Sequence, residues 1–432
     1  MSAESLLTDF VARAPAYTSD SRRARPGDVF VALKGTTRDG HDFVPALVAN
    51  GVRCVVAAGS VARLGLETAA AGGSVVEVDD PHAAHRLLAK AFRGRFPGQV
   101  IAVGGSSGKT TAKEFLAAVL AARFRTAKTD ASQNGELGIP LTLEKLRPDV
   151  EVGVVEVGID APGDMARHAA IVAPDVAVLT SIGEEHLNLL GSVQTVFREE
   201  TVLFDVTRSR GGMCFAPRDD DWLRKLDGAP GVVLVPSEPA AVEPALACPL
   251  KHPYARRNAA LATAVALHLG MTPADVVPVL GRLTLPAGRG AERRLASGTL
   301  LLLDHYNANP SSLRAGLEAA RASADEERAP LVLVLGDMLD LGAESRRAHA
   351  AIVDDLGRAG ASRIWLVGPE MGRLAPALRG AAGEVRVYPD SAAAALDASD
   401  LDAPPAVVLF KGSRGMALER ILERVERRRE EE

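Results

Sequence analysis

The segment VIAVGGSSGKTT, residues 100–111, decides the fold of this chain. Its first four residues are apolar and mostly β-branched, which is typical of a buried strand in a parallel sheet. A glycine-rich turn follows, and residues 112–120 then carry apolar side chains at helical spacing. A strand, a glycine loop that ends in Lys-Thr, and a helix together predict a phosphate-binding loop.

Each part of this loop has a role in binding a nucleotide. Glycines let backbone N–H groups close around phosphate oxygens, and the helix N-terminus adds partial positive charge. Lys109 would reach the terminal phosphates, and the hydroxyl of Thr110 would hold Mg²⁺. Val103 stands where the longer GxxxxGK[ST] pattern has its first glycine, so a glycine-rich turn without a ligand is the alternative. The flanking strand and helix favour an ATP site. The loop residues expected to contact the nucleotide are Gly105, Ser106, Ser107, Gly108, Lys109, Thr110 and Thr111.

The composition is that of an ordinary globular protein. The 432 residues suffice for two or three domains, and 47% are hydrophobic and 24% charged. The formal net charge of −5, with scattered basic residues, gives no reason to expect nucleic acid. The three cysteines are too widely spaced for a zinc or disulfide pattern. No signal peptide or membrane-spanning apolar run is seen, so we expect a cytoplasmic enzyme without membrane insertion.

Alternating strand-like and helix-like stretches predict an α/β protein of three domains, comprising residues 1–96, 97–296 and 297–432. The first boundary follows from Pro97-Gly98, because proline and glycine stop a helix and start a loop. The apolar runs predict strands at residues 29–33, 54–57, 74–78, 100–103, 152–157, 176–180, 299–303, 331–335, 364–367 and 407–410. Because helices lie between them, the sheets should be parallel, with the ligand site at the carboxyl ends of the strands.

Two polar residues at predicted strand ends suggest a metal site. Glu156 closes an otherwise apolar strand, and His186 lies just past the next strand. A carboxylate is a usual ligand of Mg²⁺, whereas an imidazole is less usual. Either residue alone is more often an ordinary strand-end or loop residue, but both should converge on the phosphate loop.

Further strings of residues carry a family resemblance. They are TSDSR at residues 18–22, PGDVFVALKG at 26–35, DGHDF at 39–43, NGELGIPLTL at 134–143, PAGR at 286–289, YNANP at 306–310, LGDML at 335–339 and KGSRGM at 411–416. With these strings in this order, the chain resembles the Mur ligase family, and most closely its MurF-type branch, over essentially its whole length.

The resemblance implies a small first domain that binds a UDP-linked sugar, a central P-loop ATPase domain, and a Rossmann-like C-terminal domain that binds the incoming amine and closes on ATP. It also implies an ATP-dependent, ADP-forming ligase that adds D-alanyl-D-alanine to a UDP-muramyl peptide in peptidoglycan precursor synthesis. The substrate carboxylate would attack the γ-phosphate to give an acyl phosphate, and the amine would then displace phosphate. We expect such an enzyme to act as a monomer.

The same resemblance assigns roles to individual residues. The catalytic set would be Lys109, Glu156, His186 and Glu200, and the metal ligands would be Thr110, Glu156, His186 and Glu200. Asn258 would contact adenine, and Arg289, Asp304 and Tyr306 would contact or close over the nucleotide. The substrates would contact Ser19, Asp20, Ser21, Arg22, Lys34, Gly35, Asn134, Glu136, Asn307 and Asn309.

The chain departs from the family at a lysine that is normally carbamylated and helps to place a second metal ion. Glu200 stands at that position, and no lysine occurs between Lys145 and Lys225. One hypothesis is that Glu200 supplies a permanent carboxylate, with a bridging water or shifted backbone to cover a reach about 3–4 Å shorter. The alternative is that Glu200 is a surface residue of a helix and that the second metal is lost or weakened.

Smaller departures leave the substrate open. Gly104 replaces the usual threonine of the loop, Gly135 a common asparagine, and Leu303 and His305 an acidic and a small hydroxyl residue. A paralogue that joins another amino acid or peptide is therefore an alternative. So is a catalytically weak relative that binds nucleotide and acts through partners.

Overall fold

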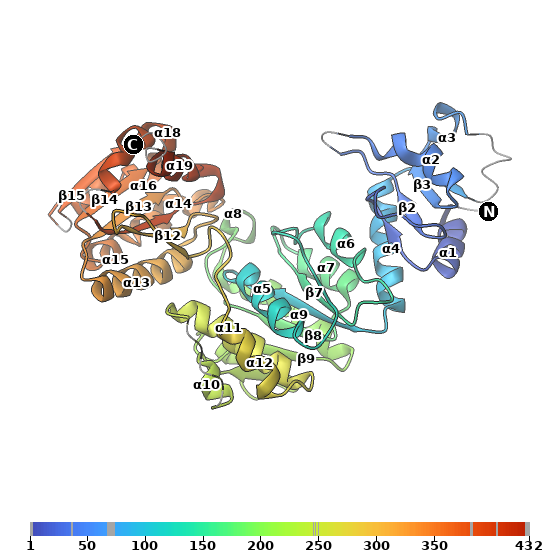
Figure 1. The fold of residues 1–432 in the computed structure, drawn as a ribbon, viewed down its shortest axis with the longest axis horizontal. Coiled ribbons are helices and arrows are strands. Elements are labelled where there is room, and N and C mark those ends of the chain that lie inside the picture. Colours follow the sequence, from blue (N-terminus) through green and yellow to red (C-terminus); the bar gives the residue numbers. More distant parts are fainter. Residues whose placement is uncertain are drawn as a thin grey trace.

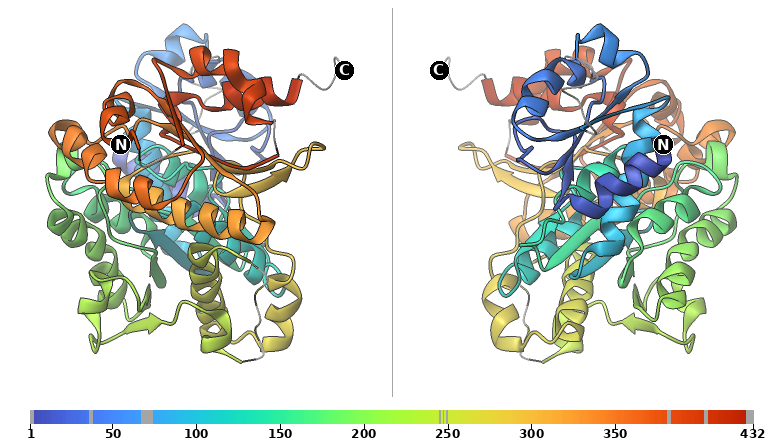
Figure 2. Two further views of the ribbon diagram at one scale, coloured as in Figure 1. Left: turned by 90° about the vertical axis from the view of Figure 1, so that its left-hand side faces the viewer. Right: turned by 90° about the vertical axis from the view of Figure 1, so that its right-hand side faces the viewer.

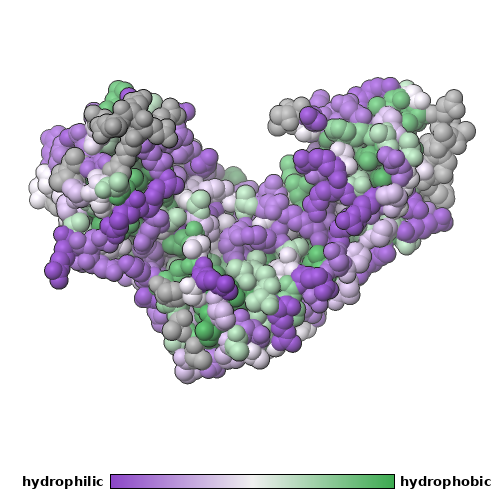
Figure 3. All heavy atoms as spheres, in the orientation of Figure 1, coloured by the Kyte–Doolittle hydropathy of each residue, from purple (hydrophilic) through white to green (hydrophobic). Residues whose placement is uncertain are grey.

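Three sheets, one in each part of the chain, organise the molecule (Figure 1). The computed structural model describes residues 3–427 except 36–37, 67–73, 245, 247, 249, 381–382 and 403–404. The first and third parts lie at opposite ends of the central part and on the same side of it (Figures 1 and 2). A broad hollow therefore separates them at the molecular surface (Figure 3).

The N-terminal part is a four-stranded parallel sheet in the order β1-β2-β3-β4. Its elements are α1 (Ala3–Arg13), β1 (Tyr17–Thr18), β2 (Val29–Val31), α2 (Val44–Ala49), β3 (Arg53–Ala57), α3 (Ser60–Arg63), β4 (Val75–Val78) and α4 (Pro81–Arg95). Helix α4 begins at a proline that directly follows the N-cap Asp80. The Asp80 side chain accepts a hydrogen bond from the His82 N–H.

The central part is a six-stranded parallel sheet in the order β10-β9-β8-β5-β7-β6. Its strands are β5 (Gln99–Gly104), β6 (Thr126–Lys128), β7 (Val152–Glu156), β8 (Val176–Leu179), β9 (Met213–Pro217) and β10 (Val232–Val235). Its helices are α5 (Lys109–Leu120), α6 (Gly138–Leu143), α7 (Asp164–Val172), α8 (Leu187–Leu190), α9 (Val193–Ser209), α10 (Pro239–Val242), α11 (Pro253–His268) and α12 (Pro273–Leu280). Strand β5 lies between β8 and β7, so the loop after it is flanked by the ends of both.

The C-terminal part is a six-stranded sheet in the order β11-β12-β16-β13-β14-β15, parallel except for the edge strand β11. Its strands are β11 (Ala291–Arg294), β12 (Leu300–Asp304), β13 (Leu331–Gly336), β14 (Arg363–Val367), β15 (Glu384–Tyr388) and β16 (Val407–Lys411). Its helices are α13 (Pro310–Glu327), α14 (Ser345–Ala350), α15 (Val353–Arg358), α16 (Pro369–Gly372), α17 (Ala375–Leu378), α18 (Ser391–Ala394) and α19 (Glu419–Arg427). Strand β11 precedes the predicted boundary at residue 297 and already pairs within this third sheet.

Side-chain alternation along β5 divides the central core into two layers. Val100 and Ala102 pack on one face of the sheet, and Ile101 and Val103 pack on the other against α5 and α11. The first of these clusters continues into the N-terminal part through residues such as Phe10, whereas the C-terminal sheet has two clusters of its own. The N-terminal part is therefore joined to the centre by a shared apolar core, and the C-terminal part is not.

The predicted fold class is confirmed. Every strand predicted from an apolar run is present within two residues of its expected ends. Strands β1, β6, β11 and β15 were not predicted because they are short or carry polar residues, and the apolar strands β9 and β10 were missed. No helix in the described part of the chain is both long and apolar enough to cross a membrane.

Candidate active site

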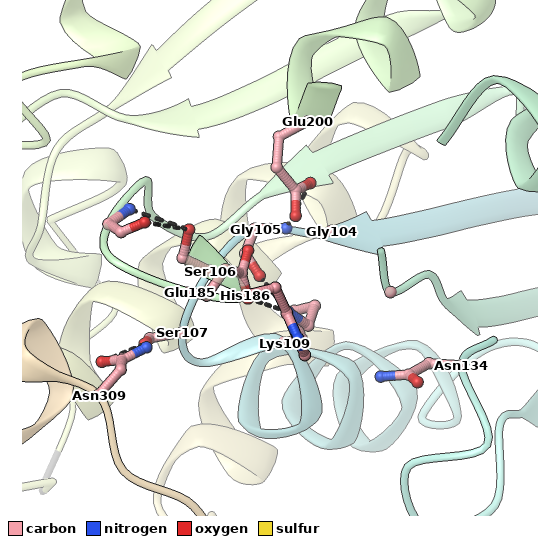
Figure 4. Close-up of polar contacts among 12 residues, drawn as sticks. Gly104, Gly105, Ser106, Ser107, Lys109, Asn134, Glu185, His186, Glu200 and Asn309 are labelled. Atoms are coloured by element: carbon pink, nitrogen blue, oxygen red, sulfur yellow. Dashed lines mark hydrogen bonds and ion pairs between the residues drawn. The ribbon is translucent and has the colours of Figure 1, made fainter. Parts of the chain in front are cut away.

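The phosphate loop runs from the end of β5 at Gly104 to the start of α5 at Lys109 (Figure 4). Gly105 and Gly108 have φ angles of +111° and +88°, which residues with a side chain rarely adopt. A Cβ atom on Gly105 would also lie 2.5 Å from Oγ1 of Thr180. Glycine is thus required at residue 105 by space as well as by conformation, and the loop packs directly on the end of β8.

Hydrogen bonds fix the loop to the turn after β8. The N–H of Ser106 donates to the carbonyl oxygen of Ser181 at 2.8 Å, and the N–H of Ser107 donates to Ser181 Oγ at 3.0 Å. The N–H of Gly183 donates to Ser106 Oγ at 2.9 Å. The first N–H groups of α5 have no acceptor within the helix, and the helix dipole adds positive potential there. The start of α5 is therefore the anion-binding part of the loop.

Lys109 is surrounded by carboxylates. Its Nζ atom lies 3.2 Å from Oε2 of Glu185 and also donates to the carbonyl oxygen of Gly105 (Figure 4). Burial by itself would lower the pKa of Lys109, but the negative charges of Glu185, Glu200 and Glu156 outweigh it and raise the pKa. The lysine is therefore a fixed positive charge beside the phosphate loop.

Glu156 ends β7 and is 1% exposed. Its Oε1 accepts hydrogen bonds from Thr110 Oγ1 at 3.1 Å and from Asn134 Nδ2 at 2.8 Å. Its Oε2 has no hydrogen-bond partner in the described part of the chain, and Lys113 Nζ lies 3.6 Å away. A buried carboxylate oxygen without a partner, next to a threonine hydroxyl, is a donor set that suits a hard cation.

His186 occupies a conformation that is unusual for a residue with a side chain. It has a φ of +45° and immediately precedes α8. Its Nε2 atom lies 3.5 Å from Oδ1 of Asp160, and the side chain is 29% exposed. The imidazole therefore lies at the solvent-accessible side of the loop and is free to meet a ligand.

A cavity of about 510 Å³ joins these groups to the C-terminal part of the chain. This volume lies in the range usual for small-molecule and cofactor sites. The predicted site residues that line it are Ser106, Ser107, Gly108, Lys109, Thr110, Thr111, Asn134, Glu156, His186, Asn258, Arg289, Asp304, Tyr306, Asn307 and Asn309. Residues distant in sequence thus meet around one volume, as predicted.

The C-terminal wall of the cavity carries its own charged groups. Lys411 is 2% exposed, and its Nζ lies 2.6 Å from Oδ2 of Asp304. The guanidinium carbon of Arg289 lies 4.1 Å from the ring centroid of Tyr306, and Arg289 also donates to Ser132 Oγ at 3.1 Å. These contacts hold one aromatic ring and three charges at the edge of the cavity.

One direct contact joins the phosphate loop to the C-terminal part. Asn309 Nδ2 donates to Ser107 Oγ at 3.0 Å (Figure 4). Asn309 also caps α13, because its Oδ1 accepts from the Ser312 N–H at 2.8 Å. Helix α13 of the C-terminal part therefore begins next to the phosphate loop.

The six N-terminal residues predicted to contact the UDP-linked donor do not line this cavity. They are Ser19, Asp20, Ser21, Arg22, Lys34 and Gly35, and they lie in the N-terminal part, across the hollow from the C-terminal part (Figures 1 and 3). Arg22 and Asp20 pair at 2.8 Å. Glu136 also lies outside the cavity lining and pairs with Arg86 at 3.0 Å.

Glu144 connects these N-terminal residues to the centre of the molecule. This carboxylate, 4% exposed, directly follows α6. It accepts from the Ser19 N–H at 2.9 Å and from Thr18 Oγ1 at 3.1 Å, and its Oε1 lies 2.7 Å from Nε2 of His85. One buried group thus orients the chain that leads into residues 19–22.

Comparison with known proteins agrees with this architecture. Three family models match in order: "Mur ligase family, catalytic domain" at residues 16–93, "Mur ligase middle domain" at 103–234, and "Mur ligase, glutamate ligase domain" at 288–414. UDP-N-acetylmuramoyl-tripeptide–D-alanyl-D-alanine ligase of Escherichia coli strain K12 is 30% identical over 94% of this chain and 92% of its own length. The chain belongs to the Mur ligase family. The relative of the same name from Treponema pallidum is also 30% identical, over 93% and 92%.

Solved Mur ligase structures superpose on the whole chain. MurF from Acinetobacter baumannii gives a TM-score of 0.77 at 26% identity, with 97% of each chain covered. MurF from Thermotoga maritima, solved in complex with ADP, gives a TM-score of 0.74 at 26% identity, covering 98% of this chain and 99% of that one. The predicted family resemblance is confirmed.

Within this Mur ligase, Glu200 is not a surface residue, so that part of the alternative was wrong, whereas the loss or weakening of the second metal stays a prediction. Glu200 lies in α9 and is fully buried. Its Oε2 accepts from the Gly105 N–H at 2.9 Å, and it is absent from the residues that line the cavity. Burial and the negative charge of Glu185 raise the pKa of Glu200 to about 8, although Lys109 and the Gly105 N–H oppose the shift.

Several cavity residues of this Mur ligase were not predicted as site residues. They include Glu185, Asp220, Tyr254, Arg257 and Lys411. Glu185 is adjacent to His186, and Lys411 opens the KGSRGM string, so both had a signal in the sequence. Lys113, behind Glu156, lies four residues after Lys109, a spacing that places both on one face of α5.

Proposed function

We propose that this Mur ligase catalyses the ATP-dependent addition of D-alanyl-D-alanine to a UDP-N-acetylmuramoyl tripeptide, releasing ADP and phosphate. The observation that carries the proposal is a single cavity in which the phosphate loop faces the Asp304–Lys411 pair of the C-terminal part. The relatives reported above carry the name of this activity over nearly their whole length. ATP must transfer its phosphoryl group to the donor carboxylate, and the amine must then attack the same carboxyl carbon, so both need one shared volume.

The residues of the loop supply the phosphoryl-transfer half of this reaction. The N–H groups at the start of α5 and the Lys109 ammonium would stabilise charge on the γ-phosphoryl group while the donor carboxylate attacks it. The carbonyl carbon of the resulting acyl phosphate would then be attacked by the incoming amine, and phosphate would leave as the amide forms. Asn258, 2% exposed beside Gly108, would contact the base.

Magnesium fits the residues present. Glu156 and Thr110 would hold it, because the buried Glu156 has a carboxylate oxygen without a hydrogen-bond partner in the described chain. His186 would contribute to a second ion. Mg²⁺ commonly completes its shell with phosphate oxygens and water, so few protein ligands are needed. Bound there, Mg²⁺ would neutralise charge between the β- and γ-phosphates.

The N-terminal part would bind the UDP-linked donor through residues 19–22 and the segment at Lys34-Gly35. The support is their position in the N-terminal family match and their connection to α6 through Glu144. The donor would then extend across the hollow toward the phosphate loop. We also infer that the enzyme acts as a monomer, and the UDP-linked donor and ATP suit a cytoplasmic enzyme.

ADP and phosphate release tests the proposal directly. The full-length protein is incubated with ATP, Mg²⁺, UDP-N-acetylmuramoyl tripeptide and a panel of amines that includes D-alanyl-D-alanine. Fastest turnover with D-alanyl-D-alanine is expected. Turnover that is fastest with another amine, or that needs a donor without UDP, would contradict it and favour a paralogue with an altered pocket near Leu303 and His305. Loss of turnover in Lys109→Ala, with Lys90→Ala on exposed α4 as control, separates a ligase from a binding protein.

A further inference from the structure

Two departures from the family pattern that are distant in sequence meet in space. Gly104 ends β5, and Glu200 reaches it from α9 (Figure 4). A Cβ atom on Gly104 would lie 2.8 Å from Oε2 of Glu200, and 3.0 Å and 3.2 Å from the Cδ2 atoms of Leu179 and Leu203. The carboxylate can occupy its position only because residue 104 has no side chain. The glycine and the glutamate are thus one structural feature.

The carboxyl group of Glu200 is directed at the backbone of the loop. Its Oε2 accepts from the Gly105 N–H at 2.9 Å, and Glu200 is not among the residues that line the cavity. The remaining oxygen, Oε1, is buried without a hydrogen-bond partner in the described chain, and so is Oε1 of Glu185. After burial, the negative charge of Glu185 is the main cause of the raised pKa of Glu200.

Glu185 extends this chain of contacts to the lysine. Its other oxygen, Oε2, lies 3.2 Å from Lys109 Nζ, which also donates to the carbonyl oxygen of Gly105. Glu200 and Lys109 therefore hold the two polar groups of the same residue, Gly105, from opposite sides. Fixing this residue fixes the point at which the strand turns into the phosphate loop.

We propose that Glu200 is a positioning residue of the phosphate loop and does not bind a metal ion. The missing side chain of Gly104 leaves room for its carboxylate, which accepts the hydrogen bond of the Gly105 N–H. Through Glu185, Glu200 also orients Lys109. The expected effect of Glu200 on turnover rests on the proposed function. The expected effect of Glu200 on nucleotide binding does not depend on that function. A carboxyl group built into the chain also makes turnover insensitive to the removal of bicarbonate.

The test compares two substitutions that keep or remove the acceptor. Glu200→Gln retains an oxygen for the Gly105 N–H without negative charge, and Glu200→Ala removes it. We expect Glu200→Ala to weaken ADP binding, measured by calorimetry on the full chain, by about tenfold, and Glu200→Gln by no more than about threefold. The Mg²⁺ concentration for half-maximal nucleotide binding stays unchanged in both. Glu199→Gln is the matched control, because that side chain caps the Met165 N–H instead.

Three results would overturn the proposal. Equal losses in Glu200→Gln and Glu200→Ala, or a shifted Mg²⁺ requirement, would show that the charge acts on a metal. Unchanged ADP binding in Glu200→Ala would show that the contact does not position the loop. Since ADP binding needs no acceptor substrate, these results are independent of whether the proposed ligase activity is found.

A double-mutant cycle guards against a variant that only unfolds. Gly104→Ala alone is expected to weaken ADP binding, because its methyl group displaces the Glu200 carboxylate. In the Glu200→Ala background the same change is expected to cost at least threefold less. Additive effects would mean that the two residues do not act together. Thermal unfolding of each variant shows whether the fold is retained.

Discussion

The Nζ atom of Lys109 lies 3.2 Å from the Oε2 atom of Glu185, so the lysine of the phosphate loop is paired with a carboxylate. Both side chains are largely buried, with 14% and 7% exposure. The ion pair sets the direction of the lysine, and a phosphate that enters the cavity must compete with the carboxylate for it. The loop is thus preorganised in position but not in its final pairing.

Replacing the lysine removes the main positive charge near the transferring group. We expect Lys109→Met to lower kcat/KM for ATP by about 10²–10³-fold, because a donor that stabilises developing charge contributes about that much. The measurement is ADP release under saturating donor and amine. Lys90→Met, on the exposed face of α4, serves as control. A rate above a tenth of the wild-type value would place phosphoryl transfer elsewhere.

Glu156 is expected to control the magnesium requirement. Glu156→Gln keeps the size of the side chain and the contacts with Thr110 and Asn134 but removes the charge. The Mg²⁺ concentration that gives half-maximal turnover should rise by about tenfold or more. A titration of turnover with Mg²⁺ at fixed ATP measures it. An unchanged midpoint would exclude Glu156 as a ligand.

Removing Glu144 should weaken the attachment of the N-terminal part. Glu144→Ala leaves the Ser19 N–H, the Thr18 hydroxyl and His85 without their buried partner, which costs about 2–4 kcal/mol of unfolding free energy. Urea unfolding measures this loss, with the exposed Glu318→Ala as control. The KM for the UDP-linked donor is expected to rise while the KM for ATP changes little. Equal changes in both would mean that Glu144 does not act on the donor site.

His305 predicts a pH dependence of stability. Burial lowers its pKa below the ordinary 6.5, and Arg414 and Arg293 act in the same direction, while Glu419 and Asp304 oppose it. Below about pH 6.5 the unfolded chain binds a proton at this residue that the folded chain resists, so acidification favours unfolding. The loss of unfolding free energy between pH 7 and pH 5 should therefore be smaller in His305→Gln than in wild type. Identical losses would contradict the assignment.

The sequence was sufficient for the parts of the fold that depend on local pattern. The apolar run at residues 100–103 and the glycines at 105 and 108 predict strand β5 and the loop, because each residue type there meets a local requirement. Glu156 and His186 could be placed at the cavity because the ends of parallel strands meet at one edge of a sheet. The assigned roles of these residues stay predictions.

Contacts between distant segments could not be read in this way. Glu200 lies 95 residues from Gly105, and the sequence alone allowed either a carboxylate that replaces the carbamate at the second metal or a surface residue of a helix. The pairing of Glu136 with Arg86, and of Lys411 with Asp304, likewise depends on how the domains pack. Local spacing carries no information about such packing, so these residues were assigned only by resemblance or not at all.

The hydrogen bond between Asn309 and Ser107 ties the phosphate loop to the third domain. Among the described residues no apolar cluster spans the centre and the C-terminal sheet, so polar contacts such as this one and the Lys251–Glu326 ion pair contribute to where that domain rests. A nucleotide that changes the contacts of Ser107 must then also change the free energy of the position that the third domain takes. Such coupling is reciprocal. If ATP favours one position of the third domain by a given factor, that position, or an amine that prefers it, increases the affinity for ATP by the same factor. Nucleotide and acceptor would sense each other without touching.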